Sequence, residues 1–194
     1  MREVLFSLLY MSEVSVEIKR IATEYVDRGI SLFKQGYNCS QSVAMVFSNL
    51  YGIDDKLMSR LIGSFGGGIG RMRETCGAAC AIFMLCGLEV TSHGERYPDK
   101  ELKKKNYEAV QYLAQLFREQ TGSIVCKELL GLNKKRLDGT LPEITICATP
   151  EERTDEYYRK RPCIRMVETA IRIYIRYLVE VRGEEDASKI LTKS

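Results

Sequence analysis

The sequence predicts an all-α fold, a single-domain bundle of about six to eight helices with a glycine-rich loop before its central helix. Three observations support this prediction. The chain has 194 residues but only four prolines, and runs of β-branched residues are few. Apolar side chains recur every three or four residues along most of the chain, which is the spacing of one helix face. Residues that cap helices stand where these apolar patterns begin and end.

Two helices are predicted in the first part of the chain. Apolar residues at helical spacing run through residues 14–35, and Gly36 can end that helix in the left-handed conformation. Asn38 is a good N-cap for a second helix, which we expect to run to about Leu50. Cys39 then becomes the first residue of this second helix.

A glycine-rich segment follows a third helix, which Asp54 caps. Four glycines fall within residues 66–70, where they break the helix and permit positive φ angles. Thr75 can cap the next helix, which covers residues 76–90. Because this helix is apolar nearly all round, we predict that it is the buried central helix.

Three more helices are predicted in the second half of the chain. Asp99 caps a long helix that runs to about residue 120, and Ser123 caps a short helix. Residues 151–160 are expected to form a helical turn. Pro162 fits the first position of the last helix. Apolar residues that alternate with arginines on this last helix are the candidate face of a homodimer.

The remaining segments are predicted to be irregular. Residues 1–13 read as a leader or an extra helix, and the sequence leaves open whether the first or the second methionine is the true start. We expect residues 132–150 to form an irregular loop and residues 183–194 to form a polar tail. The core of the single domain then spans about residues 14–182.

The composition excludes several classes of function. The net charge of +3 is spread along the chain, which is too weak for nucleic-acid binding. The longest apolar stretch, residues 78–88, is about half the length needed to span a bilayer, so no membrane segment is expected. No small-residue cleavage site follows the N-terminal apolar run, so we expect a cytoplasmic protein. Its seven cysteines are then expected to be free, metal-bound or catalytic rather than joined in structural disulfides.

Four of these cysteines stand where a helix is predicted to begin, namely Cys39, Cys76, Cys126 and Cys163. A helix start exposes free N–H groups and the positive end of the helix dipole, which lower the pKa of a thiol and favour the thiolate. The spacing of the four fits neither zinc-finger nor ferredoxin patterns. Helix starts can nevertheless meet at one end of a bundle. We therefore predict one shared site.

Glycines and cations flank the predicted site. The glycines would let the loop approach the thiolates closely and offer them N–H groups. Cations beside the cysteines would hold thiolates deprotonated or offset the charge of an anionic cluster. The glycines are Gly67, Gly68 and Gly70, and the cations are Arg71, Arg73, Lys127 and Arg161.

The other three cysteines receive different interpretations. Cys80 lies one helical turn after Cys76 and faces the same way, so it is a candidate member of the site. Cys86 lies inside the apolar helix, where a thiol acts as a small hydrophobic group. Cys147 falls in the irregular loop, as an exposed thiol or a resolving one.

The segments "YNCSQSV", "FGGGIGRMRETCGA", "CKELLG" and "CIRMVETA" resemble the C_GCAxxG_C_C family, whose name implies redox activity of its cysteines. The family pattern matches the four cysteines at helix starts by position. The core motif departs from the pattern at Thr75, Gly77 and Cys80, where the family name gives Gly, Ala and Gly. Similar modules occur beside haem domains in split-Soret-type cytochromes, where an iron–sulfur centre accompanies them. The resemblance therefore implies a redox protein and favours an iron–sulfur cluster.

Three functional hypotheses follow. In the favoured one, Cys39, Cys76, Cys126 and Cys163 hold an iron–sulfur cluster that passes electrons to a redox partner protein. In the second, no metal is bound, and Cys76 is the attacking thiolate, assisted by Arg73, with Cys80 or Cys39 as the resolving thiol. In the third, the same four cysteines hold a zinc ion that stabilises a structural or interaction module.

Overall fold

The computed structural model of the protein describes residues 14–91, 99–135, 140 and 147–193. Within these residues the chain forms α-helices and short 3-10 turns and no β-strand, which confirms the all-α prediction. The α-helices are α2 (Val16–Lys34), α3 (Cys39–Ala44), α4 (Asp55–Ile62), α5 (Gly77–Val90), α6 (Lys100–Thr121), α7 (Cys126–Leu129), α8 (Asp155–Lys160), α9 (Cys163–Arg182) and α10 (Glu184–Thr192).

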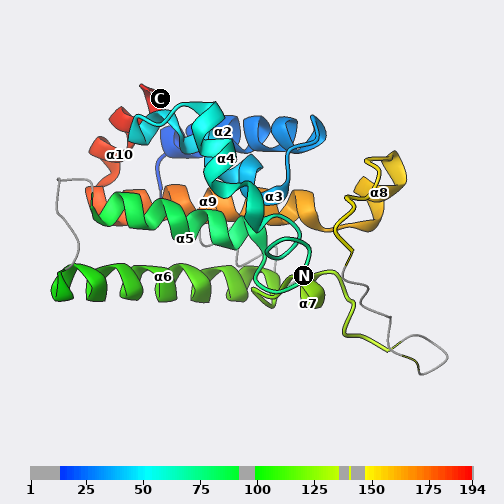
Figure 1. Cartoon of the computed structure of the whole chain (residues 1–194). Helices are drawn as coiled ribbons and strands as arrows, with labels where there is room; N and C mark the ends of the chain where they lie inside the picture. Colours follow the sequence, from blue (N-terminus) through cyan, green and yellow to red (C-terminus); the bar gives the residue numbers. More distant parts are fainter. Residues whose placement is uncertain (1–13, 92–98, 136–139, 141–146, 194) are drawn as a thin grey trace.

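The helices lie in three layers (Figure 1). α5 and α9 pack side by side in the middle layer, and α6 covers both of them from one side. α2, α3 and α4 lie on the other side, where α2 packs on α9 and α3 packs on both middle helices. α10 closes one end of the bundle, and α8 lies at the opposite end. No helix of the described residues is both long and apolar enough to cross a bilayer.

The central helix of the sequence prediction is α5. Most of its surface is buried, as predicted, although Phe83, Met84, Gly87 and Leu88 form a half-buried stripe along one side. Its alanines allow neighbouring helices to approach closely, and its larger side chains fill the core between them. The side chains of α5 with no exposed surface are Ala78, Ala79, Ala81, Ile82, Leu85 and Cys86. Cys86 therefore lies in the core, as predicted for a packing residue.

The apolar residues of the last helix are also buried inside the protomer. The predicted dimer face contains Ile171, Tyr174, Ile175 and Leu178, and none of these side chains is more than 1% exposed. They pack against α2, α3, α5 and α6 because α9 runs through the middle layer. These residues consequently belong to the core of one chain rather than to a surface that a second copy covers.

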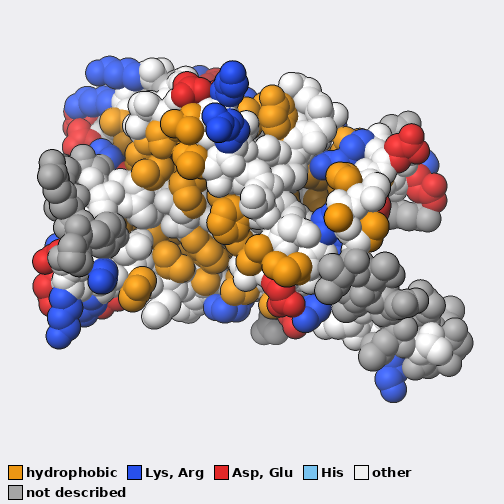
Figure 2. Space-filling view, in the orientation of Figure 1, with side chains coloured by type: hydrophobic (Ala, Val, Ile, Leu, Met, Phe, Trp, Pro, Cys, Tyr) orange, Lys and Arg blue, Asp and Glu red, His pale blue; other side chains and the backbone are white. Residues whose placement is uncertain are grey.

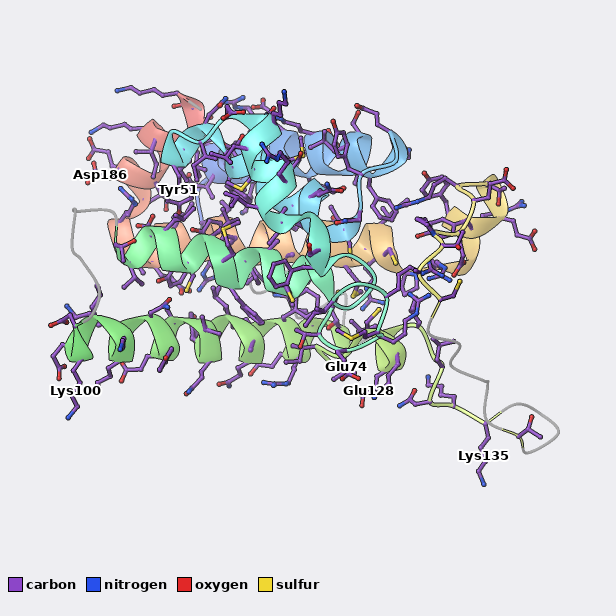
Figure 3. All side chains as sticks on the ribbon, in the orientation of Figure 1. Tyr51, Glu74, Lys100, Glu128, Lys135 and Asp186 are labelled. Carbon is purple, nitrogen blue, oxygen red and sulfur yellow. The ribbon has the colours of Figure 1, made fainter. Side chains whose placement is uncertain are left out.

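A buried polar network joins α5 to α9 at the end of the bundle nearest α10. Arg182 donates two hydrogen bonds to the Glu89 carboxylate, from Nε at 2.6 Å and from Nη2 at 2.8 Å. The Tyr51 hydroxyl donates to the same carboxylate at 3.0 Å and also contacts the Tyr174 hydroxyl. Tyr51 lies on the α10 side of the bundle, away from Glu74 and Glu128 (Figure 3). These bonds satisfy the buried carboxylate far from the four cysteines of interest.

Several boundaries differ from the predicted ones. The second helix ends at Ala44, and short 3-10 turns continue to Tyr51, because the chain must bend toward α4 there. The central helix begins at Gly77 with Cys76 as its N-cap, so Thr75 is not the cap. The short helix after α6 is a single turn that starts at Cys126 and is preceded by Val125 rather than capped by Ser123.

The C-terminal segment differs most from the prediction. Residues predicted as a polar tail form α10, on which Ala187 and Leu191 are buried. The Tyr25 hydroxyl of α2 donates a hydrogen bond to the carbonyl of Leu191 at 3.0 Å. This extra helix raises the number of α-helices in the described residues to nine, above the six to eight predicted.

The predicted leader, residues 1–13, lies outside the described residues. The described part of residues 132–150 is irregular, as predicted.

Candidate functional site

The four cysteines predicted at helix starts line one cavity of about 310 Å³. Cys39 is the first residue of α3, Cys126 of α7 and Cys163 of α9, whereas Cys76 is the N-cap of α5. Four chain segments that are distant in sequence therefore meet at the same place. The cavity lies between the bundle and the segment that leads into α8, where the surface is hollowed beside basic and hydrophobic side chains (Figure 2).

Asn38 fixes the position of Cys39. Its Oδ1 accepts hydrogen bonds from the backbone of Ser40 at 3.1 Å and of Gln41 at 3.0 Å, which caps α3. Its Nδ2 donates to the carbonyl of Gly63 at 2.8 Å. A methyl group at Gly66 would lie 2.5 Å from the Asn38 side chain, so only glycine lets the loop pass there. The cap thus ties Cys39 to the glycine-rich segment.

Backbone pairing holds Cys76 next to Cys126. Thr75 and Val125 form an isolated antiparallel bridge. Within it, the N–H of Cys76 donates to the carbonyl of Ile124 at 2.7 Å, and the N–H of Cys126 donates to the carbonyl of Glu74 at 2.6 Å. The starts of α5 and α7 are therefore joined directly by hydrogen bonds. Glu74 and Glu128 lie near one another beside α7 (Figure 3).

The glycine-rich segment runs through the cavity wall with an unusual backbone. Nearly every residue from 67 to 73 has a positive φ angle, and three of these are not glycine. Left-handed backbone costs a non-glycine residue roughly 1–2 kcal/mol, so the segment stores strain that its surroundings must offset. Strain of this kind concentrates at functional sites. The residues with positive φ are Gly67, Gly68, Ile69, Gly70, Arg71 and Arg73.

Cys39 has the most acidic thiol of the four. A hydrogen bond from the Cys76 thiol, together with the N–H groups of Gly67 and Ser40, lowers its pKa to about 6 against the opposing effect of burial. The same hydrogen bond, together with burial and the negative charge of Cys39, raises the pKa of Cys76 well above its usual range. The pair therefore shares one proton, and the N–H groups of Gly67 and Ser40 favour Cys39 as its thiolate.

The other two cavity thiols stay protonated. Burial and the nearby charge of Cys39 raise the pKa of Cys163 to about 12. The same two causes raise the pKa of Cys126, although the Arg73 guanidinium opposes them with its charge and a hydrogen bond. Arg73 is itself only 6% exposed, so it supplies a buried cation to the site.

The remaining predicted site residues are placed as follows. Gly67 and Gly70 line the cavity, and Gly68 lies against Cys126, because a methyl group there would be 2.6 Å from the Cys126 Cβ. Cys80 is buried but does not line the cavity, and burial raises the pKa of its thiol to about 12. Cys147 is exposed, and its carbonyl accepts a hydrogen bond from Arg71 at 2.7 Å.

The sequence reasoning missed the cavity residues that come from the stretch around α8. Glu151, Arg153 and Tyr157 lie in or before α8, a stretch whose sequence indicates only a helical turn. They reach the cavity because this stretch folds back beside α2, where the Arg153 guanidinium lies over the ring of Phe33 at 4.6 Å. No local pattern in the sequence signals that contact.

The donor set suits some metal groups better than others. Among the described residues, no three Cys, His, Asp or Glu side chains lie where they could hold a metal ion. A zinc ion needs its ligands at about 2.0–2.3 Å, so these thiols would have to move to take one. An iron–sulfur cluster divides its four cysteine ligands among several irons, and four thiols on one cavity fit that chemistry.

The comparisons with known proteins agree with this site. The family described as "Putative redox-active protein (C_GCAxxG_C_C)" matches residues 37–177, which is well over half of the chain and includes all four cavity cysteines. No curated protein and no solved structure matches the chain. With four family cysteines gathered on one cavity and a match of this extent, the chain belongs to the C_GCAxxG_C_C family.

Proposed function

We propose that the protein is a thiol redox protein in which Cys39 and Cys76 cycle between a thiolate–thiol pair and a disulfide. The single observation that carries this proposal is the closeness of the two cysteines: both line the cavity, and the Cys39 Sγ lies against the start of α5, where a methyl group at Gly77, the residue after Cys76, would be 2.7 Å from it. Two sulfurs in such contact need little movement to form a bond. The thiolate is the nucleophile in disulfide exchange, and Cys39 is the thiolate of the pair.

The reaction would proceed in two exchanges. The Cys39 thiolate attacks one sulfur of a substrate disulfide, which forms a mixed disulfide and releases the other substrate sulfur as a thiolate. The Cys76 sulfur then attacks Cys39, which breaks the mixed disulfide, and the proton of Cys76 passes to the leaving thiolate. The substrate gains two electrons, and the protein dithiol loses them. This assignment reverses the sequence hypothesis, in which Cys76 attacked.

A redox titration tests this proposal directly. The metal-free protein would be equilibrated in dithiothreitol buffers of graded potential, alkylated, digested and analysed by mass spectrometry. We expect a Cys39–Cys76 disulfide that forms and disappears as one two-electron step. A disulfide at another pair, or free thiols throughout the range, would contradict the proposal.

The lowered pKa of Cys39 predicts how its reactivity depends on pH. A thiol whose pKa is about 6 is mostly thiolate above that pH, so the rate of alkylation by iodoacetamide should rise up to about pH 7 and then level off. An ordinary cysteine keeps gaining reactivity beyond pH 8. Peptide-resolved mass spectrometry separates Cys39 from the exposed Cys147. In Cys76→Ala, the donated hydrogen bond is lost, and the midpoint should move toward the usual range.

An iron–sulfur cluster is the second candidate function. The observation that favours it is the placement of four cysteines from four helix starts on one cavity that also contains Arg73 and Arg161. When bound, such a cluster accepts and donates single electrons, which a redox partner protein would exchange with it. Cys39, Cys76, Cys126 and Cys163 would be the ligands, and the cations would balance the cluster's negative charge.

Anaerobic reconstitution separates the two candidates. The protein would be incubated with iron and sulfide without oxygen, desalted, and examined by visible spectroscopy and by iron and sulfide assays. A brown protein whose colour is lost in Cys163→Ser but kept in Cys86→Ser would support the cluster. A colourless, iron-free protein that still forms the Cys39–Cys76 disulfide would contradict the cluster and support the dithiol function.

A further inference from the structure

Three arginines surround one carboxylate at the mouth of the cysteine pocket. Oε1 of Glu151 lies 3.4 Å from Nη2 of Arg71 and 3.5 Å from Nη2 of Arg73, and it makes a closer ion pair with Arg161. Strong bonds between guanidinium and carboxylate groups are about 2.7–2.9 Å long. Glu151 therefore pairs closely with Arg161 and only loosely with the other two guanidiniums, so that three arginine charges face one carboxylate.

A fourth guanidinium beside the pocket, that of Arg153, is only partly hydrogen-bonded. Nη1 of Arg153 is buried and has no hydrogen-bond partner among the described residues, while its Nη2 donates to the carbonyl of Tyr37 at 3.4 Å. The rings of Phe33 and Tyr157 lie 4.6 and 4.8 Å from this guanidinium and hold its plane in place. A buried donor without a partner costs free energy, which a ligand that accepts its hydrogen bond would recover.

Glu151 is more exposed than the arginines around it. Its side chain is 41% exposed, whereas the side chains of Arg71, Arg73 and Arg161 are between 7% and 21% exposed. It also lies in a segment without secondary structure, between the exposed Cys147 and α8. The cations are thus built into the pocket wall, and the carboxylate that meets them arrives from the surface.

We propose that these arginines form a subsite for the carboxylate of a small organic substrate, and that Glu151 occupies this subsite in the free protein. The cavity of about 310 Å³ exceeds what one carboxylate fills, and apolar walls continue from the arginines toward the cysteines. The ligand is therefore an organic anion rather than a bare oxyanion. The apolar wall residues are Phe33, Leu129, Leu130, Pro162 and Met166.

The subsite also indicates the class of redox substrate, and this part rests on the proposed dithiol function. Cys39 and the arginines line the same cavity, so a molecule with its carboxylate at the arginines can present a sulfur to Cys39. The substrate is then a small disulfide that carries a carboxylate. Its reduction follows the two exchanges described above and yields two thiols, of which at least one carries the carboxylate.

A pair of probe disulfides tests the substrate class. The reduced full-length protein would be mixed with 3,3′-dithiodipropionate, which is anionic, or with bis(2-hydroxyethyl) disulfide, which is neutral, and the formation of the Cys39–Cys76 disulfide would be timed by acid quench and alkylation. We expect the anionic probe to react roughly tenfold faster or more. Arg153→Gln and Arg161→Gln should remove most of this preference, whereas Lys104→Gln on the exposed face of α6 should keep it. Equal rates for the two probes would overturn the substrate assignment.

A binding measurement tests the subsite without any redox step. Adipate, an unreactive dicarboxylate, would be titrated calorimetrically into the Cys39→Ser/Cys76→Ser variant. We expect binding that weakens about tenfold in Arg161→Gln and strengthens severalfold in Glu151→Gln, because the amide no longer competes as an anion. If adipate binds this variant but the thiols of the native protein react with neither probe disulfide, the dithiol function is refuted and the subsite is supported. The subsite is refuted if adipate fails to bind or binds equally to all variants.

Discussion

Cys39→Ser is expected to abolish disulfide exchange in this protein, the largest functional effect of any single substitution. Serine cannot form the Cys39–Cys76 bond, and its hydroxyl is not ionised at neutral pH, so both the nucleophile and the final disulfide are lost. The rate of reaction with a small disulfide should fall to that of the exposed Cys147 alone, which a Cys147→Ser background removes. Rapid quench, alkylation and mass spectrometry measure this rate.

Two companion variants show whether the pair is assigned correctly. Cys76→Ser should retain the first exchange and accumulate a mixed disulfide on Cys39, because no thiol remains to resolve it. Cys80→Ala should behave like the native protein, since Cys80 does not line the cavity. A Cys80→Ala protein that traps the mixed disulfide would instead establish Cys80 as the resolving thiol and contradict the assignment to Cys76.

Gly68→Ala is expected to lower the free energy of unfolding by about 2–5 kcal/mol. Gly68 has a φ of 74°, which costs alanine roughly 1–2 kcal/mol. The added methyl group would also lie 2.6 Å from the Cys126 Cβ and 2.8 Å from the backbone nitrogen of Glu74. Overpacking against such atoms typically costs a further 1–3 kcal/mol. Urea unfolding followed by circular dichroism measures the sum.

Gly70→Ala is a matched control in the same segment. Its φ of 58° imposes the same kind of strain, but a methyl group there would meet nothing within 4 Å. It should therefore cost only about 1–2 kcal/mol. The difference between the two variants isolates the contact between the loop and Cys126. Equal losses of stability would mean that backbone strain alone decides the cost, and that the close approach to Cys126 is unimportant.

Local signals explain which parts of the fold could be predicted. Asn38 caps α3 through its own side chain, so the sequence alone places Cys39 at a helix start. Asp99 and Gly122 bound α6 in the same way. Thr75 has an equally suitable side chain, but its backbone pairs with Val125, fifty residues away in sequence, and this long-range contact moves the start of α5 by one residue.

The site was predictable only in part for the same reason. The four cysteines could be selected because each stands at a helix start. Their common cavity was expected because helix starts can meet at one end of a bundle. The direct contact between Cys39 and Cys76 depends on how α3 packs against α5, which no sequence spacing specifies. Glu151 and Arg153 were missed because their segment carries no pattern until it folds back against α2. Likewise, α10 is recognisable only from the surface on α2 and α9 that it covers.

The cavity is complete only after the ribosome has synthesised all four of its cysteines, from Cys39 to Cys163. Domains emerge from the ribosome N-terminus first, at about 5–20 residues per second, so on the order of 10 s separates the translation of the first cavity cysteine from that of the last. During this interval the nascent chain carries its early cysteines without the helix that will shield them. Any cofactor insertion must follow translation, and oxidants present in that interval would act on unpaired, accessible sulfur.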